Sequence, residues 1–513
     1  MLSTIYSAGI FGIDGFIVSV ECNGLNGLSE FHLVGLPDAA VKEAYDRVHT
    51  ACINSGLRFP PLRLMINLAP ADRKKEGTAF DVAILLGILR CGGLVDPSVN
   101  LSRSCFVGEL SLSGELRGVR GALCMCSAAK NAGMTEFYVP EANAREAAAI
   151  RGINVYAVKN VRQLLSHLNG AERMTPVPPS TSEPSVYSEG MPDFADVQGQ
   201  ALAKRAMEIA AAGGHNILLI GPPGTGKSML AKRLPTILPP LSFDEAVETT
   251  KIHSVAGTLK ENVALIADRP FRSPHHTMSA VSLVGGGVNP RPGEISLANN
   301  GVLFLDELPE FPKQVTESLR QPLEDGKITI TRAAGRVTYP CSFMLVAAMN
   351  PCRCGYYGDT RHTCTCSQKD IRNYVSKISG PLLDRIDIQV VLPGLTYDEL
   401  SVKESREEPS AKIRERVIAA RKFAKSRFSS EKGIFCNAQL DSAMLRKYCK
   451  IDDAASALMR RAYDSMGLSA RGYDRTLRLA RTIADLAGSE TIGAAHIAEA
   501  IQFRTLDRKF WGN

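Results

Sequence analysis

The sequence has few of the features that mark exported, membrane-embedded or fibrous proteins. Its first residues lack the basic, apolar, small-residue order of a signal peptide. The longest apolar run, residues 82–89, is bounded by Asp81 and Arg90 and is too short to cross a bilayer. We find no tandem repeats and no coiled-coil heptads. These absences lead us to expect a cytoplasmic globular protein without a membrane partner.

Neither the charge nor the cysteine content singles out a function. The formal net charge of +7 is small for 513 residues, so any basic surface that binds nucleic acid must be local. The 13 cysteines do not form the framework of a small secreted domain, so we expect reduced thiols, a subset of which could bind metal. The length exceeds what one hydrophobic core supports and predicts two or three domains.

A segment rich in proline, serine and threonine, residues 169–191, divides the chain and is typical of an extended linker. Residues 1–168 before it alternate strand-like and helix-like runs, which predicts an α/β domain. Residues 192–396 contain the motifs described next. Residues 397–513 carry arginine-rich amphipathic segments and are expected to form a helical lid. The helices expected there are 411–427, 441–449, 452–465 and 471–487.

The most informative motif fits the pattern G-x-x-x-x-G-K-[ST] between an apolar strand and a helix. Its glycines allow a tight turn whose N–H groups face a phosphate, and the helix start adds to this anion site. Lys227 would neutralise the β- and γ-phosphates of a nucleoside triphosphate, and Ser228 would ligate Mg²⁺. The nucleotide-binding residues are Gly221, Pro222, Pro223, Gly224, Thr225, Gly226, Lys227 and Ser228.

A second motif follows 78 positions after Ser228, where the apolar run 302–305 ends in Asp306 and Glu307. A buried strand would deliver both carboxylates to its end. Asp306 would hold the same Mg²⁺, and Glu307 would orient and deprotonate the attacking water. The two motifs together predict hydrolysis of a nucleoside triphosphate.

Three further polar residues refine the class of ATPase. Asn350 ends another apolar strand and could sense the γ-phosphate. Arg385 stands between Asp384 and Asp387, where it is either an arginine finger for a neighbouring subunit or a helix-end ion-pair residue. Arg471 opens an amphipathic helix and is a candidate second sensor.

This order of motifs resembles the AAA+ superfamily. A narrower resemblance, to the magnesium-chelatase-like ATPases of the YifB/ComM family, rests on the run RSPHHT at 272–277 and on residues 283–287, 292–297 and 301–310. It extends over essentially the whole chain. The resemblance implies a hexameric ATP-driven motor, and ComM members are DNA helicases that drive branch migration when transforming DNA is integrated.

Two segments of the ATPase region are candidate DNA contacts. Residues 283–293 are rich in Gly and Pro, so we expect a mobile, pore-facing loop with little core. Residues 327–339 predict a β-hairpin whose tip carries Arg332 and Arg336. It resembles the pre-sensor hairpin of minichromosome-maintenance helicases, whose basic tip grips DNA. The alternative is an exposed hairpin with solvated arginines.

Four cysteines in two C-x-C pairs follow Asn350 at a spacing of nine residues. The thiols of Cys352, Cys354, Cys364 and Cys366 suit a tetrahedral structural Zn²⁺, and His362 could replace one of them. Free thiols in a surface loop or redox-labile pairs are the alternatives.

The N-terminal domain resembles the Lon-protease domain, which cleaves peptides with a Ser–Lys dyad. The serine position aligns with Ala79, beside Thr78, and the lysine position falls at about Leu123. Both catalytic groups are therefore missing, and we expect a role in assembly or DNA handling instead of proteolysis.

The prediction is thus an α/β protein with a Lon-protease-like domain, a parallel-sheet P-loop AAA+ core with a β-hairpin insertion, and a helical lid. It would bind ATP and Mg²⁺, form a homo-hexamer and act on single-stranded or branched DNA. Two rivals stay open: a chelatase-type motor that remodels a metal-inserting partner, and a protein unfoldase. An unfoldase usually has an aromatic pore loop, whereas the hairpin tip here is basic.

Overall fold

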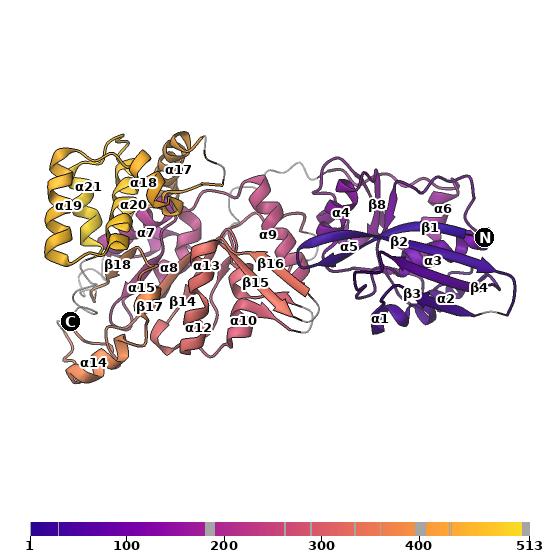
Figure 1. The fold of residues 1–513 in the computed structure, drawn as a ribbon, viewed down its shortest axis with the longest axis horizontal. Helices are drawn as coiled ribbons and strands as arrows, with labels where there is room; N and C mark the ends of the chain where they lie inside the picture. Colours follow the sequence, from indigo (N-terminus) through magenta and orange to yellow (C-terminus); the bar gives the residue numbers. More distant parts are fainter. Residues whose placement is uncertain are drawn as a thin grey trace. The chain divides into compact units, whose positions relative to one another are not determined.

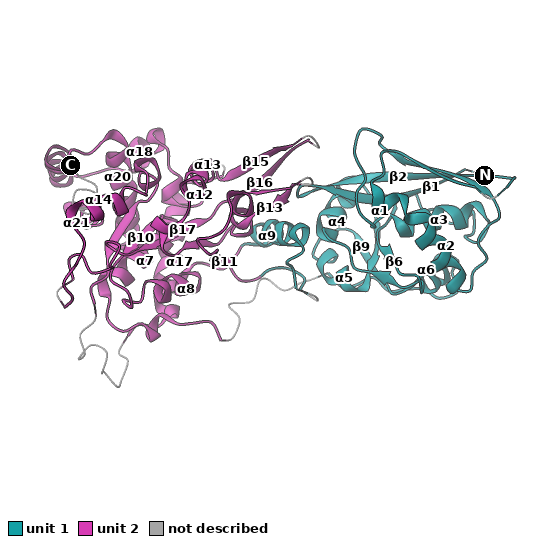
Figure 2. Cartoon of the chain, turned by 90° about the horizontal axis from the view of Figure 1, so that it is seen from below, with its two compact units in different colours: residues 1–184, 242–266 teal, residues 185–241, 267–513 magenta. Residues whose placement is uncertain are grey.

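The computed structural model describes residues 2–28, 30–179, 190–260, 263–287, 290–332, 335–359, 361–394, 407–429, 431 and 433–504. The chain divides into two compact units (Figure 2). Unit 1 consists of residues 1–184 and 242–266, and unit 2 of residues 185–241 and 267–513. The segment 242–266 therefore belongs to unit 1, although the sequence motifs place it inside the ATPase region.

Unit 1 is built on a mixed sheet of seven strands (Figure 1). β1 (Leu2–Phe11) and β2 (Asp14–Leu25) form a long antiparallel pair in which buried and less buried side chains alternate. This alternation is the pattern of a sheet with one face on the core. The strand order is β3 (Phe31–Val34), β4 (Arg63–Ala69), β2, β1, β5 (Ser104–Phe106), β8 (Glu136–Pro140), β9 (Asn154–Val158).

The helices of unit 1 enclose this sheet. The most buried is α3 (Asp81–Cys91), in which every residue except Arg90 is buried, and it contacts both β1 and β2. Its apolar run is therefore a core helix. The other elements are α1 (Ala39–Lys42), α2 (Ala44–Asn54), α4 (Ala122–Asn131), α5 (Glu141–Ala147), α6 (Val161–Leu168) and the short strands β6 (Glu109–Leu110) and β7 (Leu116–Arg117).

Helix α9 (Phe243–Ala256) completes unit 1 from a distant part of the sequence. A capping box of Ser242 and Glu245 starts it, and Gly257 ends it in the left-handed conformation. Ser254 on its inner face donates to Glu146 and accepts from the backbone N–H of Gly121 at 3.0 Å. These buried bonds, which join residues more than 100 positions apart, attach α9 to α4 and α5.

The first part of the predicted linker also packs on unit 1. Met174 and Val177 contact its hydrophobic clusters, and the N–H of Val177 donates to the carbonyl of Val155 at 2.8 Å. This part is thus held by the fold rather than extended through solvent. Residues 180–189 of the linker lie outside the described residues.

Unit 2 contains a sheet of five parallel strands. The residues of its three central strands are buried throughout, which explains why the sequence shows unbroken apolar runs there. The order is β11 (Phe271–Arg272), β14 (Val302–Leu305), β17 (Met344–Met349), β10 (Ile217–Ile220), β18 (Ile388–Val391). Because all strands run the same way, their carboxyl ends meet at one edge, where ligands bind in open parallel sheets.

Helices cover this sheet and form the C-terminal region (Figure 1). The predicted C-terminal helical region is confirmed. It comprises α17 (Ser410–Arg427), α18 (Ser442–Tyr448), α19 (Asp453–Met466), α20 (Ala470–Leu486) and α21 (Ala494–Gln502). Val417 and Leu479 from these helices share one hydrophobic cluster with Ile217 of the sheet. The other α-helices among the described residues of unit 2 are α7 (Ala201–Gly213), α8 (Lys227–Ile237), α10 (Ala280–Val284), α11 (Glu294–Leu297), α12 (Lys313–Ser318), α13 (Arg320–Asp325), α14 (Gln368–Val375) and α15 (Gly380–Leu383).

Among the residues with described positions, no helix is long and apolar enough to cross a membrane. All 13 cysteines are described, and none of them forms a disulfide.

Candidate nucleotide site

The phosphate-loop motif lies between β10 and α8, at the carboxyl edge of the five-stranded sheet. Gly224 and Gly226 have φ values of 79° and 87°, a region that residues with a Cβ rarely adopt. A side chain on Gly221 would meet the carbonyl oxygen of Leu392 at 2.6 Å. The three glycines are therefore required by this backbone path, as the motif predicted.

Lys227 begins α8 and is buried inside the loop. Its Nζ donates to the carbonyls of Gly221 and Pro222 at 2.6 and 2.8 Å, and to Oδ1 of Asn350 at 3.2 Å. Burial lowers the pKa of Lys227 to about 8, although the carboxylates of Asp306 and Glu307 oppose this shift. An anion beside this ammonium group would favour its charged form.

The two acidic residues follow β14 directly. Oγ of Ser228 donates to Oδ2 of Asp306 at 2.6 Å, so the structure brings together the two residues proposed to hold Mg²⁺. Glu307 has a φ of 53°, unusual for a residue other than glycine. Asp306 accepts the backbone N–H of Glu307 at 3.0 Å. The side chain of Glu307 is half-exposed, and Nδ1 of His276 lies 3.4 Å from its Oε2.

Arg385 lies at the opposite edge of the sheet. Its backbone carbonyl accepts from Nδ2 of Asn216, the residue before β10, at 2.8 Å. Its guanidinium pairs with Glu324 and donates to the carbonyl of Pro381 at 2.7 Å. Among the described residues, no acceptor reaches its Nε. The side chain lines a hollow of about 490 Å³ that also contains Arg320.

Arg471 lies in the first turn of α20, and its side chain is exposed. The contacts of the described residues do not join it to the phosphate loop. One turn later, Arg475 is buried, and its NH1 lies 3.7 Å from Oδ1 of Asp384. Of the four arginines on this helix, Arg471 and Arg475 lie nearest its start, and only the exposed Arg471 was expected from the sequence as a sensor.

The hairpin expected at 327–339 is formed by β15 (Lys327–Arg332) and β16 (Gly335–Pro340). Arg332 pairs with Gly335 next to the turn of the hairpin, and both Arg332 and Arg336 are exposed. Ala333 and Ala334, which connect the strands, lie outside the described residues. The hydroxyl of Tyr339 donates to the carbonyl of Pro290 at 2.7 Å, so the hairpin packs on the insertion at 283–293.

This insertion differs from our expectation. Leu283 is fully buried, and Gly285 and Gly286 of β12 pair with Arg291 and Pro292 of β13. The prediction that the segment contributes little core was wrong for its ends, because α10 brings Leu283 inside. Residues 288 and 289 are not among the described residues.

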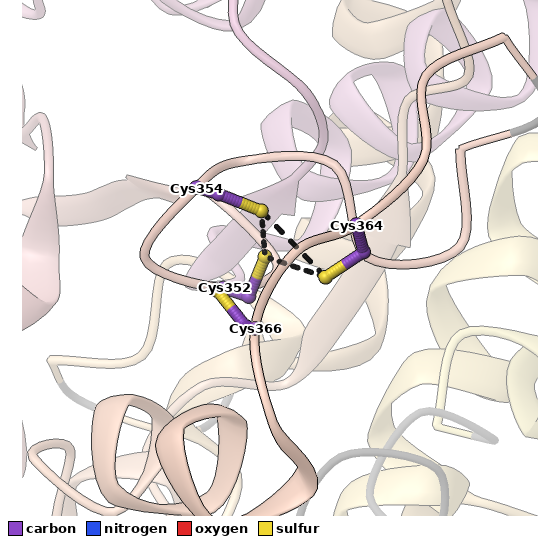
Figure 3. Close-up of side chains that lie close together, drawn as sticks. All are labelled: Cys352, Cys354, Cys364 and Cys366. Carbon is purple, nitrogen blue, oxygen red and sulfur yellow. Dashed lines mark hydrogen bonds between the residues drawn. The ribbon is translucent and has the colours of Figure 1, made fainter.

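The four cysteines lie together, with sulfur atoms directed into one space (Figure 3). All four Sγ atoms lie within 4.8 Å of one another. Backbone N–H groups, first that of Tyr356, lower the pKa of Cys354 to about 5. Instead of joining this set, His362 pairs through Nδ1 with Asp359 at 3.0 Å.

Sequence comparisons find similar proteins over nearly the whole chain. Three family models match the chain. The model of magnesium chelatase subunit ChlI matches residues 193–400, that of subunit ChlI of Mg-chelatase matches residues 20–143, and that of the ChlI C-terminal region matches residues 407–504. Competence protein ComM of Haemophilus influenzae is 42% identical over 99% of this chain and 98% of its own length. YifB of Salmonella typhimurium is 41% identical over the same shares. The chain belongs to the ComM/YifB family.

Membership of the ComM/YifB family makes the chain a magnesium-chelatase-like AAA+ protein and supports an ATPase activity with ATP and Mg²⁺. A more distant relative is the DNA replication licensing factor mcm2 of Schizosaccharomyces pombe, 25% identical over 56% of this chain and 34% of its own length.

In this ComM/YifB chain, the two positions that the expected Lon-like resemblance assigns to the dyad are occupied by core residues. Ala79 and Leu123 are both buried in one hydrophobic cluster. The neighbouring hydroxyl of Thr78 donates to Glu109 and is half-buried. Neither position supplies a nucleophile or a base.

Two residues of the ComM/YifB site were not assigned roles from the sequence. His276, which contacts Glu307, lies in the RSPHHT run, and that run was the signal that could have indicated it. Gln200 donates through Nε2 to the carbonyls of Pro393 at 2.8 Å and Thr225 at 3.4 Å, and so contacts the phosphate loop. A glutamine before a helix carries no such signal.

Proposed function

We propose that this chain is the subunit of a cytoplasmic hexameric ring that hydrolyses ATP to move along DNA, as a helicase or branch-migration translocase. The observation that carries this proposal is the exposed pair Arg332 and Arg336 on a hairpin that packs against the insertion, within the same unit as the phosphate loop. Six copies of such a hairpin would form a basic ring suited to a phosphate backbone.

The residues of the nucleotide site divide the chemistry. Lys227 holds the β- and γ-phosphates. Ser228 and Asp306 would hold Mg²⁺, which would supply positive charge beside the transferred group. Glu307 orients the attacking water and accepts its proton, and Asn350 contacts the γ-phosphate. The 2.6 Å contact between Ser228 and Asp306 supports this division, because it places a hydroxyl and a carboxylate side by side, and Mg²⁺ prefers oxygen ligands of this kind.

Arg385 acts on the site of the neighbouring subunit. β10 separates it from the phosphate loop of its own chain, because Asn216 holds Arg385 at the amino end and Gly221 follows the carboxyl end. A strand of four residues spans roughly 13 Å, about twice the reach of an arginine side chain. This separation supports an action in trans, in which the guanidinium stabilises transition-state charge in the site of the next subunit. Arg471 is proposed as the second sensor, at the start of α20.

Among the relatives, the DNA replication licensing factor supports DNA as the partner by its name. A chelatase-type or protein-remodelling motor is the second candidate, because family models of chelatase subunit ChlI match three parts of the chain.

A stimulation assay tests the proposal. The ATPase rate should rise with single-stranded or forked DNA, and Arg332→Ala with Arg336→Ala should weaken DNA binding while basal hydrolysis persists. The salt dependence of binding should fall by about 1 in log–log slope for each phosphate that is no longer bound. Lys327→Ala, at the exposed base of the same hairpin, is the matched control. A rate indifferent to DNA but raised by unfolded protein would favour the second candidate.

A further inference from the structure

The cysteine loop, residues 352–366, lies between Asn350 at the end of β17 and the start of α14. Cys352 is fully buried, and Cys354, Cys364 and Cys366 are partly exposed. The Sγ of Cys352 lies 3.3 Å from that of Cys354 and 3.7 Å from that of Cys364 (Figure 3). Cys354 and Cys364 are 3.6 Å apart.

These separations fit one metal ion. A tetrahedron with Zn–S bonds of about 2.3 Å has sulfur–sulfur edges of roughly 3.8 Å. An iron–sulfur cluster places several irons and bridging sulfides between its thiolates, and so needs wider spacing than four atoms within 4.8 Å of one another. Four thiolates around one ion leave no position open, which indicates a structural and not a catalytic site.

The loop also touches the nucleotide site. The N–H of Gly355 donates to the carbonyl of Cys352 at 3.0 Å and closes a turn in which Gly355 has a φ of 91°. At this turn the backbone approaches the phosphate loop so closely that a Cβ on Gly355 would lie 2.7 Å from Cδ of Pro223. The same strand end provides Asn350, which accepts from Lys227 at 3.2 Å.

We propose that Cys352, Cys354, Cys364 and Cys366 bind one Zn²⁺, and that this ion holds the cysteine loop against Pro223 and keeps Asn350 and the phosphate loop in register. The ion is thus a positioning element of the nucleotide site. The positioning role rests on the proposed nucleotide binding, whereas the binding of zinc by the four cysteines does not.

Metal analysis tests the first part. Purified protein should contain about one zinc per chain by elemental analysis, and Cys364→Ser with Cys366→Ser should contain less than about a tenth of that. Cys436→Ser, a partly exposed cysteine of unit 2 outside the loop, should keep its zinc. Wild-type protein without bound zinc, or with stoichiometric iron and its visible absorption, would overturn the assignment.

Nucleotide affinity tests the second part. Chelator-stripped wild-type protein should bind a fluorescent ATP analogue about tenfold more weakly and recover on adding Zn²⁺ alone, while its helical circular dichroism is unchanged. Recovery shows that the loss is not unfolding. Full affinity in the stripped protein would overturn the positioning role.

The Gly355→Ala variant distinguishes the effect of zinc binding from that of the contact between Gly355 and Pro223. The new methyl group meets Pro223 and strains a left-handed turn, so the variant should keep its zinc and yet bind the analogue about tenfold more weakly. Gly358→Ala is the matched control, because that glycine has a φ of 79° but no heavy atom near its Cβ position. Equal affinities in the two variants would show that the Pro223 contact does not matter. Loss of all nucleotide binding in zinc-loaded wild-type protein would instead count against the proposed function and leave the zinc site standing.

Discussion

The two edges of the five-stranded sheet hold their polar groups in different ways. At the carboxyl edge, Lys227 is bonded to carbonyls of its own glycine-rich loop and to Asn350. At the amino edge, His215 is fully buried between Asp387, at 3.1 Å, and Thr482 of α20, at 2.8 Å. The first set can exchange loop carbonyls for phosphate oxygens, whereas the second is fixed by side chains from three distant segments.

The amino edge also contains a buried carboxylate, that of Asp387, which the fold keeps ionised. Burial alone would raise the pKa of Asp387, but the bond from His215 and the nearby Arg475 and Arg478 lower it overall. Asp387 therefore stays ionised and contributes stability that is lost only as the pH falls through its lowered pKa. This fixed edge presents Arg385, two residues earlier in the chain. This difference supports our proposal that one edge binds the nucleotide of its own chain and the other serves a neighbouring subunit.

Lys227→Ala should have the largest effect on the carboxyl edge. Without the ammonium group the phosphate charge is uncompensated, so ATP affinity should fall at least about 100-fold. Lys232→Ala, an exposed lysine on the same helix, should bind normally. Equilibrium titration with a fluorescent ATP analogue measures both, and equal affinities would remove Lys227 from the phosphate site.

Arg385→Ala should remove the function proposed for the amino edge of the sheet. We expect turnover to fall about 1,000-fold while ATP affinity changes less than about threefold, because the arginine stabilises charge only in the transition state. Mixing this variant with Glu307→Gln should restore part of the activity, since some interfaces then combine an intact Glu307 with an intact Arg385 from the next subunit. Mixtures that are no more active than their components would contradict the action in trans.

The pH dependence of ATP binding tests the role of Lys227 at the carboxyl edge of the sheet. Lys227 has a pKa of about 8, lowered from 10.5 by burial, and bound phosphate favours its charged form. Above pH 8 binding must therefore take up a proton, and affinity should fall by about tenfold per pH unit. Stability should change the other way, because the unfolded state binds more protons between pH 8 and 10.5, so unfolding becomes harder as pH rises. Titrations at several pH values check the first trend, and denaturant unfolding checks the second. Affinity independent of pH over this range would contradict the role of Lys227.

His276→Ala should have the smallest effect. Its imidazole lies 3.4 Å from the carboxylate of Glu307 and helps to orient it, so kcat should fall by about fivefold with ATP affinity unchanged. His275→Ala is the matched control, because His275 is exposed and its Nδ1 bonds Thr277 instead. Identical kcat values for the two variants would show that His276 does not position Glu307.

Local sequence was enough to predict the elements whose conformation depends on neighbours in the chain. The glycines of the phosphate loop, the buried strands and the amphipathic C-terminal helices follow from backbone freedom and periodicity. The helical segment predicted at 411–427 is α17, Ser410–Arg427, and that at 471–487 is α20, Ala470–Leu486. The hairpin and the carboxylates after β14 are local patterns of the same kind.

What the sequence did not reveal depends on contacts between distant segments. Periodicity cannot tell that α9 belongs to unit 1, because its partners Gly121 and Glu146 lie more than 100 positions away. Nor does it show that Leu283 is buried.

The sequence by itself determined which residues are the candidates for binding phosphate, Mg²⁺ and zinc, since these sites depend on residue type and close spacing. Only the tertiary structure decided that Ser228 meets Asp306, that His276 reaches Glu307, and that Arg385 lies at the edge away from its own phosphate loop. The order and direction of the parallel strands fix these distances, and that order is set by packing of the whole core.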